Sequence, residues 1–234
     1  MSGPEGRTLK IVHAGGVAGA AAAEGVVVVI DVFRAFSVSA YALAAGAECC
    51  RLVREVEEAK ALAARIPGSV MSAEVDGLPV EGIEISNSPT QITHTDLKGR
   101  VLVQRTSAGT QAMAAAKRAE RRYAGSLVVA SATAREIVDS GCELVTLVAS
   151  RPDHEEDVAC ARLLEALLRG EPAPAGPFDA LYASPRYREV SSGVRAGFPS
   201  TDCTLALMTD RFAFSMPVDT DELGILVTAR PAPA

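Results

Sequence analysis

The sequence predicts an α/β protein with three α/β/α layers and a mostly parallel, mixed central sheet. The first observation is a run of five aliphatic residues at positions 26–30, which is typical of a strand buried on both faces. The second is that apolar runs of strand length alternate with helical stretches from residue 26 to residue 170. This alternation favours parallel strands joined by helices on both faces. We expect a single domain over residues 1–234, with the weakest pattern from about residue 172.

The expected strands are short apolar runs that end at polar or turn residues. In chain order they are residues 9–12, 26–30, 50–53, 69–73, 101–103, 144–149 and 223–228. We expect the long segment 75–89, which is rich in Gly, Pro and Ser, to be a loop with a function. We expect the tail from Arg230 onward to be disordered.

The expected helices carry apolar or alanine residues at helical spacing. In residues 55–66 these positions alternate with charged ones, and Pro67-Gly68 ends the pattern. Gly46 is a suitable C-cap for the helix that follows Arg34. The expected helices are an Ala-rich segment up to Glu24, the segment from Arg34 to Gly46, and residues 55–66, 111–119, 131–139, 157–169 and part of 178–194.

The charge balance argues against nucleic acid as a partner. The chain has 29 acidic and 23 basic residues and a formal charge of −6. Residues 117–122 are the densest basic segment, but Ala119 and Glu120 interrupt it, and we expect a solvated helix end there. No dense Lys/Arg cluster stands out to release counterions from phosphates. The Ala-rich helices carry few charges, which is compatible with a homo-oligomer.

The cysteines and the apolar runs predict a cytoplasmic protein. The five cysteines lack a CxxC spacing, and Cys49, Cys50 and Cys142 fall in expected strands. We therefore expect small core residues in a reducing compartment rather than disulfides or a zinc site. The N-terminal ten residues lack the apolar segment of a leader. No apolar run approaches the roughly 20 residues that span a bilayer, so we expect no membrane partner.

Polar side chains follow two of the expected strands. Asp31 and Arg34 come directly after residues 26–30, and Glu74 follows residues 69–73. Open α/β sheets bind their ligands at the carboxyl ends of strands, which favours a functional role for these residues. The alternative is that Asp31 caps the next helix and pairs with Arg34.

A third strand is followed by the sequence QRTSAGT at residues 104–110. A strand, a turn rich in hydroxyls and glycine, and a helix start together present free backbone N–H groups, which is typical of an anion site. Arg105 beside the hydroxyls favours this interpretation. The alternative is an ordinary N-cap formed by Thr106, Ser107 or Thr110.

A fourth strand, residues 144–149, precedes His154 and the acids Glu155, Glu156 and Asp157. Acidic residues in a first helical turn are favourable for the helix dipole alone. His154 could act as a general acid, although an ordinary loop histidine is the favoured interpretation.

In a parallel sheet we expect these strand ends to converge on one edge. Carboxylates without His or Cys suit a hard ion such as Mg²⁺. Arginine and hydroxyl-rich turns suit phosphate oxygens. The combination predicts a Mg²⁺-dependent phosphoryl-transfer site that acts on a small phosphate ester.

The same residues resemble a known family. Residues 30–35, Ile-Asp-Val-Phe-Arg-Ala, resemble the IDVLRA signature of the 2-phosphosulfolactate phosphatases. Residues 86–89 resemble the GNSP motif of that family, and residues 106–110 its TTNGT motif. Glu156-Asp157 is similar to its ED pair, and all four motifs occur in the family's order and spacing between residues 26 and 170.

The resemblance implies a Mg²⁺-dependent phosphatase that converts 2-phosphosulfolactate to sulfolactate and phosphate, on a route to coenzyme M. It implies Asp31 and Asp157 as metal carboxylates with Glu156 and Glu74 close by. The implied catalytic residues are Asp31, Arg34, Glu156 and Asp157. The implied substrate-binding residues are Arg34, Asn87, Ser88, Arg105, Thr106, Ser107, Gly109 and Thr110. Water activated by Mg²⁺ is the expected nucleophile, with a covalent route through Asp31 as the alternative.

The sequence departs from the family motifs at three positions. Ala108 replaces an asparagine, Ser86 replaces a glycine, and Arg105 stands where a small or hydroxyl residue is usual. These changes alter the surroundings of the second anionic group. They leave two alternatives, a phosphatase for another phospho-hydroxy acid and a non-catalytic anion-binding relative.

Overall fold

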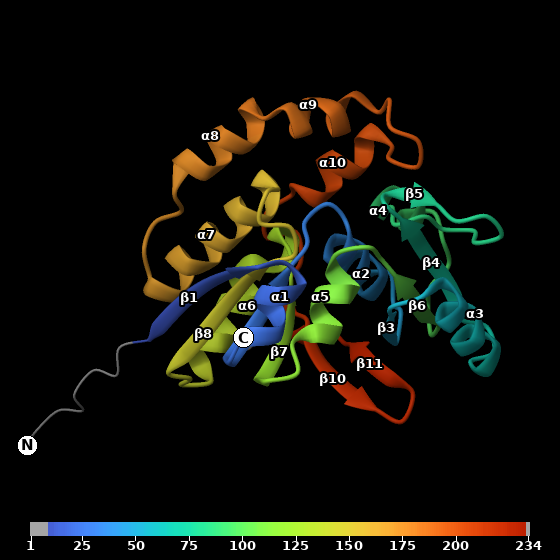
Figure 1. Ribbon diagram of the computed structural model, residues 1–234, viewed down its shortest axis with the longest axis horizontal. Helices are drawn as coiled ribbons and strands as arrows, with labels where there is room; N and C mark the ends of the chain where they lie inside the picture. Colours follow the sequence, from blue (N-terminus) through green and yellow to red (C-terminus); the bar gives the residue numbers. More distant parts are fainter. Residues whose placement is uncertain (1–8, 233–234) are drawn as a thin grey trace, which may run out of the picture.

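The computed structural model describes residues 9–232, which form a ten-stranded sheet between layers of helices (Figure 1). The predicted three-layer α/β/α fold class is confirmed. The expectations for residues 1–8 and for the last two residues of the tail lie outside the described part. In sheet order the strands are β1 (Lys10–Gly15), β8 (Leu144–Ala149), β2 (Gly25–Ile30), β7 (Ala119–Gly125), β10 (Pro217–Asp221), β11 (Gly224–Val227), β3 (Cys49–Val53), β6 (Val101–Arg105), β4 (Val70–Val75) and β5 (Leu78–Pro79).

Strand β2 is buried on both faces, as its aliphatic run predicts. Val27 and Val29 join one hydrophobic cluster, and Val26, Val28 and Ile30 join another. The first cluster includes residues from α1 (Gly16–Ala22), α2 (Ala35–Ala44), α4 (Pro89–Thr93) and α5 (Gly109–Ala115). The second includes residues from α6 (Ala130–Asp139), α7 (Glu155–Arg169), α9 (Pro185–Ser192) and α10 (Ser200–Ala206).

Capping residues begin or end several helices close to the bounds expected from the sequence. Helix α3 (Val56–Arg65) begins with a capping box between Glu55 and Glu58. Helix α7 ends at Gly170, whose φ of 70° suits a glycine C-cap. Helices α8 (Ala175–Ala183) and α9 form an arc over the upper edge of the molecule in Figure 1.

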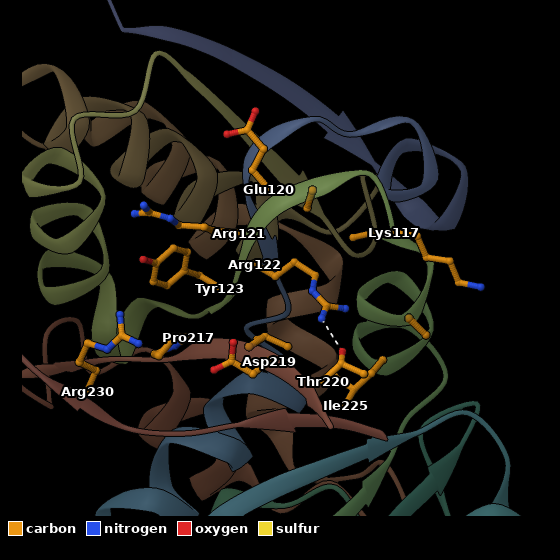
Figure 2. A pocket seen from close by; sticks show the side chains of 14 residues that line it. Lys117, Glu120, Arg121, Arg122, Tyr123, Pro217, Asp219, Thr220, Ile225 and Arg230 are labelled. Carbon is orange, nitrogen blue, oxygen red and sulfur yellow. Dashed lines mark hydrogen bonds between the residues drawn. The ribbon is translucent and has the colours of Figure 1, made fainter. Parts of the chain in front are cut away.

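A C-terminal hairpin makes the sheet mixed. The groups β1-β8-β2-β7 and β3-β6-β4 are each parallel, and the antiparallel hairpin β10-β11 joins them. Strand β10 pairs with β7 through Pro217 and Val218 only. Beyond these pairs the strands border a cavity of about 640 Å³ (Figure 2). Arg122 reaches across it and donates from Nη2 to Thr220 Oγ1 at 2.7 Å, which holds the two strands together.

The largest correction concerns residues 117–122, which were expected to form a solvated helix end. Helix α5 ends at Ala115, and residues 119–125 form the central strand β7, paired in parallel with β2. Charged residues open this strand because its first half borders the β7–β10 cavity and remains accessible, whereas Tyr123 is buried. Pairing with β2 therefore overrides the helical composition of this segment.

Smaller corrections concern loops and ends. Cys142 lies in the loop before β8 rather than in a strand. Residues 230–231 of the expected disordered tail form β12 (Arg230–Pro231), which pairs with β9 (Phe214–Ser215). Glu74 and Arg105 belong to β4 and β6 themselves rather than following them.

Two further expectations concern the cysteines and the membrane. All five cysteines are free thiols. Within residues 9–232, none of the helices has both the length and the apolar character to cross a membrane.

A substitution at Gly25 would test the close contact between β2 and β8. Its φ is +69°, and a Cβ atom there would lie 2.5 Å from the carbonyl oxygen of Leu144. We expect Gly25→Ala to lower the free energy of unfolding by about 3 kcal/mol, from backbone strain and overpacking together. Gly16→Ala is the matched control, because its φ is +63° but nothing lies within 4 Å of the added Cβ. It should cost only about 1 kcal/mol in urea unfolding, and equal losses would contradict the contact.

Candidate functional site

The ends of several strands enclose one cavity of about 210 Å³, here called the strand-end cavity. Asp31 reaches it from the end of β2, Glu74 from β4, and Ser150 from the end of β8. The turn before α5 contributes Ser107, and the C-terminal segment contributes further residues. The predicted convergence of the strand ends is therefore present in the structure.

Asp31 lies in the floor of the cavity at the start of α2. Its Oδ1 accepts a hydrogen bond from the backbone N–H of Ala35 at 3.0 Å. The start of α5 lies against it, since a Cβ atom on Gly109 would be 2.7 Å from Asp31 Oδ2. Burial raises the pKa of Asp31, and the charge of Glu74 adds to the rise. Asp31 thus accepts the first N–H of α2 and also lines the cavity, but the expected pair with Arg34 is wrong, because Arg34 pairs with Asp202 instead.

Glu74 is buried in β4 and fixes the turn before α5. Its Oε1 accepts the backbone N–H of Ser107, and its Oε2 accepts the Gly77 N–H at 2.6 Å and the Ser107 hydroxyl at 3.1 Å. Arg105 donates to the carbonyl oxygens of Glu74 and Arg54 and to the Ser107 hydroxyl. The guanidinium of Arg105 therefore braces the loop and does not line the cavity.

The remaining hydroxyls of the turn bond mainly to one another. The Thr110 N–H donates to Thr106 Oγ1 at 3.1 Å, and the Thr110 hydroxyl donates to the Thr106 carbonyl at 2.8 Å. Neither threonine lines the cavity, whereas Ala108 and Ser107 do. The N-cap of α5 is Ala108 rather than Thr106, Ser107 or Thr110, although Thr106 Oγ1 accepts an N–H of the first turn. The predicted role of both threonines in phosphate binding stays a prediction.

Of the two predicted residues Asn87 and Ser88, only Asn87 lines the cavity. Asn87 lines the cavity, and its Oδ1 accepts from Gln104 Nε2 at 3.3 Å. Ser88 is fully buried as the N-cap of α4, and its hydroxyl donates to Asp202 Oδ1 at 2.7 Å.

Asp157 lies beneath the cavity rather than in its lining. Its Oδ1 accepts the Val32 N–H at 2.8 Å, and its Oδ2 accepts the Ser150 hydroxyl at 2.9 Å and the Arg151 N–H at 3.2 Å. It joins the end of β2 to the end of β8. Burial, with the charges of Asp31 and Glu156, raises its pKa well above the usual value.

Glu156 is fully buried and pairs with Arg186, whose Nε donates to Oε1 at 2.7 Å. The other oxygen, Oε2, has no hydrogen-bond partner among the described residues. Burial raises the pKa of Glu156, and the charge of Arg186 opposes the rise. Glu156 thus holds a cavity-lining arginine in place.

His154 lines the cavity, with its Nδ1 3.5 Å from Glu156 Oε1. Burial lowers its pKa to about 4, and the charge of Arg186 contributes to the fall. The lowered pKa disfavours the imidazolium that a general acid of this kind would need, and the predicted role of His154 stays a prediction.

Four arginines line the cavity, and they give it the chemistry of an anion site. Arg34 was predicted, but Arg151, Arg186 and Arg195 were not. Arg151 follows an apolar strand, so the rule that selected Asp31 could have found it. Arg186 and Arg195 belong to the C-terminal segment, where no strand pattern marks them. Arg195 donates from Nη2 to the Asp76 carbonyl at 3.1 Å, at the rim of the cavity.

Comparison with known proteins decides the family. Residues 15–192 match the 2-phosphosulpholactate phosphatase family. The chain belongs to this family. The predicted resemblance is confirmed, and the match extends past the four motifs into α9.

Curated proteins with similar sequences carry the name of the same family. Proteins named "Probable 2-phosphosulfolactate phosphatase" from Bacillus subtilis and Carboxydothermus hydrogenoformans are 33% and 36% identical over 146 and 145 residues. These alignments cover 61% of this chain in both cases, and 64% and 60% of the relatives. A protein of the same name from Deinococcus radiodurans is 33% identical over 55% of this chain and 54% of its own length. The chain thus matches less than two thirds of the length of these relatives.

The donor set of the cavity fits Mg²⁺, the ion that the family resemblance implies. Within residues 9–232, no three His, Cys, Asp or Glu side chains are grouped to hold a metal. Mg²⁺ does not need such a cage, because it binds through one or two carboxylates together with waters and phosphate oxygens. Asp31 and Glu74 are the two of the four predicted metal carboxylates that line the cavity.

The raised pKa of Asp31 predicts how its charge affects stability. A carboxyl whose pKa is higher in the folded state opposes folding once the pH rises through that folded-state value. In metal-free buffer, Asp31→Asn should therefore raise the free energy of unfolding relative to wild type at pH 8. At pH 5 the gain should be smaller. Asp219→Asn, at an exposed carboxylate, is the control in urea titrations; a gain that is equal at both pH values would refute the charge argument.

Proposed function

We propose that this protein is a Mg²⁺-dependent phosphatase for a small phosphate monoester with a second anionic group, 2-phosphosulfolactate. The products would be sulfolactate and phosphate. The observation that supports this most is the strand-end cavity, which is lined by Asp31 together with Arg34, Arg151, Arg186 and Arg195. Membership of the family supports the same substrate. The free thiols fit a reducing cytoplasm, where sulfolactate would enter the route to coenzyme M.

In this proposal the arginines bind both anionic groups. Guanidinium groups pair with phosphate and sulfonate oxygens through charge-assisted hydrogen bonds and stabilise the charge on the transferring group. A cavity of about 210 Å³ fits a small substrate. Asp31 would orient the attacking water by accepting its proton or its hydrogen bond. Mg²⁺, held by Asp31 and Glu74, would polarise the phosphate and lower the pKa of a bound water.

The first test is phosphate release by the purified protein with Mg²⁺ and with a chelator. The substrates are phosphosulfolactate, phospholactate and 3-phosphoglycerate, which keep the phosphate and vary the second group. We expect release that needs Mg²⁺ and favours the sulfonate, and at least about a hundredfold loss of kcat in Asp31→Asn. A preference for a carboxylate substrate would keep the mechanism and change the substrate. No release from any of them would favour the anion-binding relative, and full activity of Asp31→Asn would refute the role of Asp31.

A second test concerns Arg151, which lines the cavity and has no ion pair among the described residues. Its charge is therefore free for a substrate anion. We expect Arg151→Ala to raise KM about tenfold, the effect of one lost charge-assisted hydrogen bond. Arg135→Ala in α6 is the matched control, because Arg135 is exposed and does not line the cavity, and it should leave KM unchanged.

A further inference from the structure

We infer that Asp202 is a positioning residue for the phosphate site, and that it acts by fixing the guanidinium of Arg34. Asp202 lies in α10, beyond the residues 15–192 that match the family. The inference rests on the proposed function only in its kinetic consequence. Its structural content, that one buried carboxylate orients the cavity arginine, stands on contacts alone.

Arg34 is held entirely by the C-terminal segment. Its Nη1 donates to Asp202 Oδ2 at 2.7 Å and to the carbonyl oxygen of Gly197 at 2.6 Å. The ring of Phe198 lies under the guanidinium, with its centroid 3.9 Å from Cζ. These three contacts restrain the plane and the direction of the guanidinium as it lines the cavity.

Asp202 also holds the segment that carries Asn87. Its Oδ1 accepts the Ser88 hydroxyl at 2.7 Å and the Thr90 N–H at 2.9 Å. One carboxylate therefore links two cavity-lining residues, Arg34 directly and Asn87 through its neighbour Ser88. Both oxygens are used, and each serves a different side of the cavity.

The charges of the pair depend on each other because both groups are buried. Arg34 is 2% exposed and Asp202 is 0% exposed. Burial lowers the pKa of Arg34, and Asp202 opposes that fall. Removing one member of such a pair leaves an uncompensated buried charge, which moves or draws in water to relieve the cost. Without Asp202, Arg34 would therefore lose its fixed direction toward the cavity.

The kinetic test compares Arg34→Ala, Asp202→Asn and the double variant. Asp202→Asn keeps the side-chain volume but removes the charge and one acceptor. We expect KM to rise about tenfold or more with a smaller change in kcat. The double variant should be no worse than Arg34→Ala, because the amide oxygen that Asp202→Asn retains can still accept from Ser88 and Thr90, and the lost charge acts through Arg34. Losses that multiply in the double variant, or an unchanged KM in Asp202→Asn, would overturn the inference.

A second readout does not depend on turnover. The Nη1–Hη signals of Arg34 in an ¹⁵N spectrum, whose protons bond to Asp202 and Gly197, can be assigned by their absence in Arg34→Ala. We expect a protected signal in the wild type that shifts or exchanges away in Asp202→Asn. If the wild type released no phosphate, the proposed function would fail while this signal still decided the role of Asp202. An unchanged signal in Asp202→Asn would overturn that role.

Two further variants separate positioning from general stability. Asp210→Asn removes a carboxylate that likewise accepts an N–H and a hydroxyl, both from Ser131 at α6, away from the cavity. It should lower the thermal midpoint without changing KM or the Arg34 signal. If Asp202→Asn does not fold, Arg34→Met with Asp202→Asn should fold, because it removes both charges. Failure of that double variant to fold would show a role of Asp202 independent of Arg34 and overturn the inference.

Discussion

The site depends on how the fold compensates the carboxylates that it buries at one edge of the sheet. Burial raises the pKa values of Asp31, Glu156 and Asp157, and the charge of a neighbouring acid adds to the rise in each case. An unpaired buried charge costs several kcal/mol even after the protein relaxes. Each of these carboxylates accordingly meets a donor, and the donors determine where the segments around the cavity lie.

Two kinds of donor perform this compensation. Backbone N–H groups bind Asp31, Glu74 and Asp157, and they come from the strand ends and helix starts that surround the cavity. The positive charge of Arg186 compensates the buried Glu156 carboxylate, and the negative charge of Asp202 compensates the buried Arg34 guanidinium. The amide contacts fix the floor of the cavity through the backbone. The ion pairs attach α9 and α10 to that floor, and residues of the C-terminal segment thereby line the cavity.

The floor was predictable from sequence, whereas the rest of the cavity was not. Residues 26–30 and 144–149 are long aliphatic runs, and their periodicity identifies buried strands whose polar neighbours Asp31 and Asp157 then stand out. The pattern failed for β7, where AERRYAG looks helical and only pairing with β2 makes it a strand. It also failed for Arg186 and Arg195, because they sit on a short helix and a loop. Arg186 is placed by an ion pair with Glu156, and Arg195 by a hydrogen bond to the Asp76 carbonyl.

Asp31 and most of the arginines that line the cavity come from different segments of the chain, and this affects substrate choice in the proposed reaction. The motif at the end of β2 supplies Asp31 and Arg34, while the other arginines that line the cavity come from segments that carry no motif. Ala108, at the position of a motif asparagine, lines the cavity but offers no polar atom, and Ser107 is already bound to Glu74. Recognition of the second anionic group would then fall to Arg151, Arg186 and Arg195. Members of such a family can keep the reaction and change the acid that they accept, because the residues for each task lie on different parts of the chain.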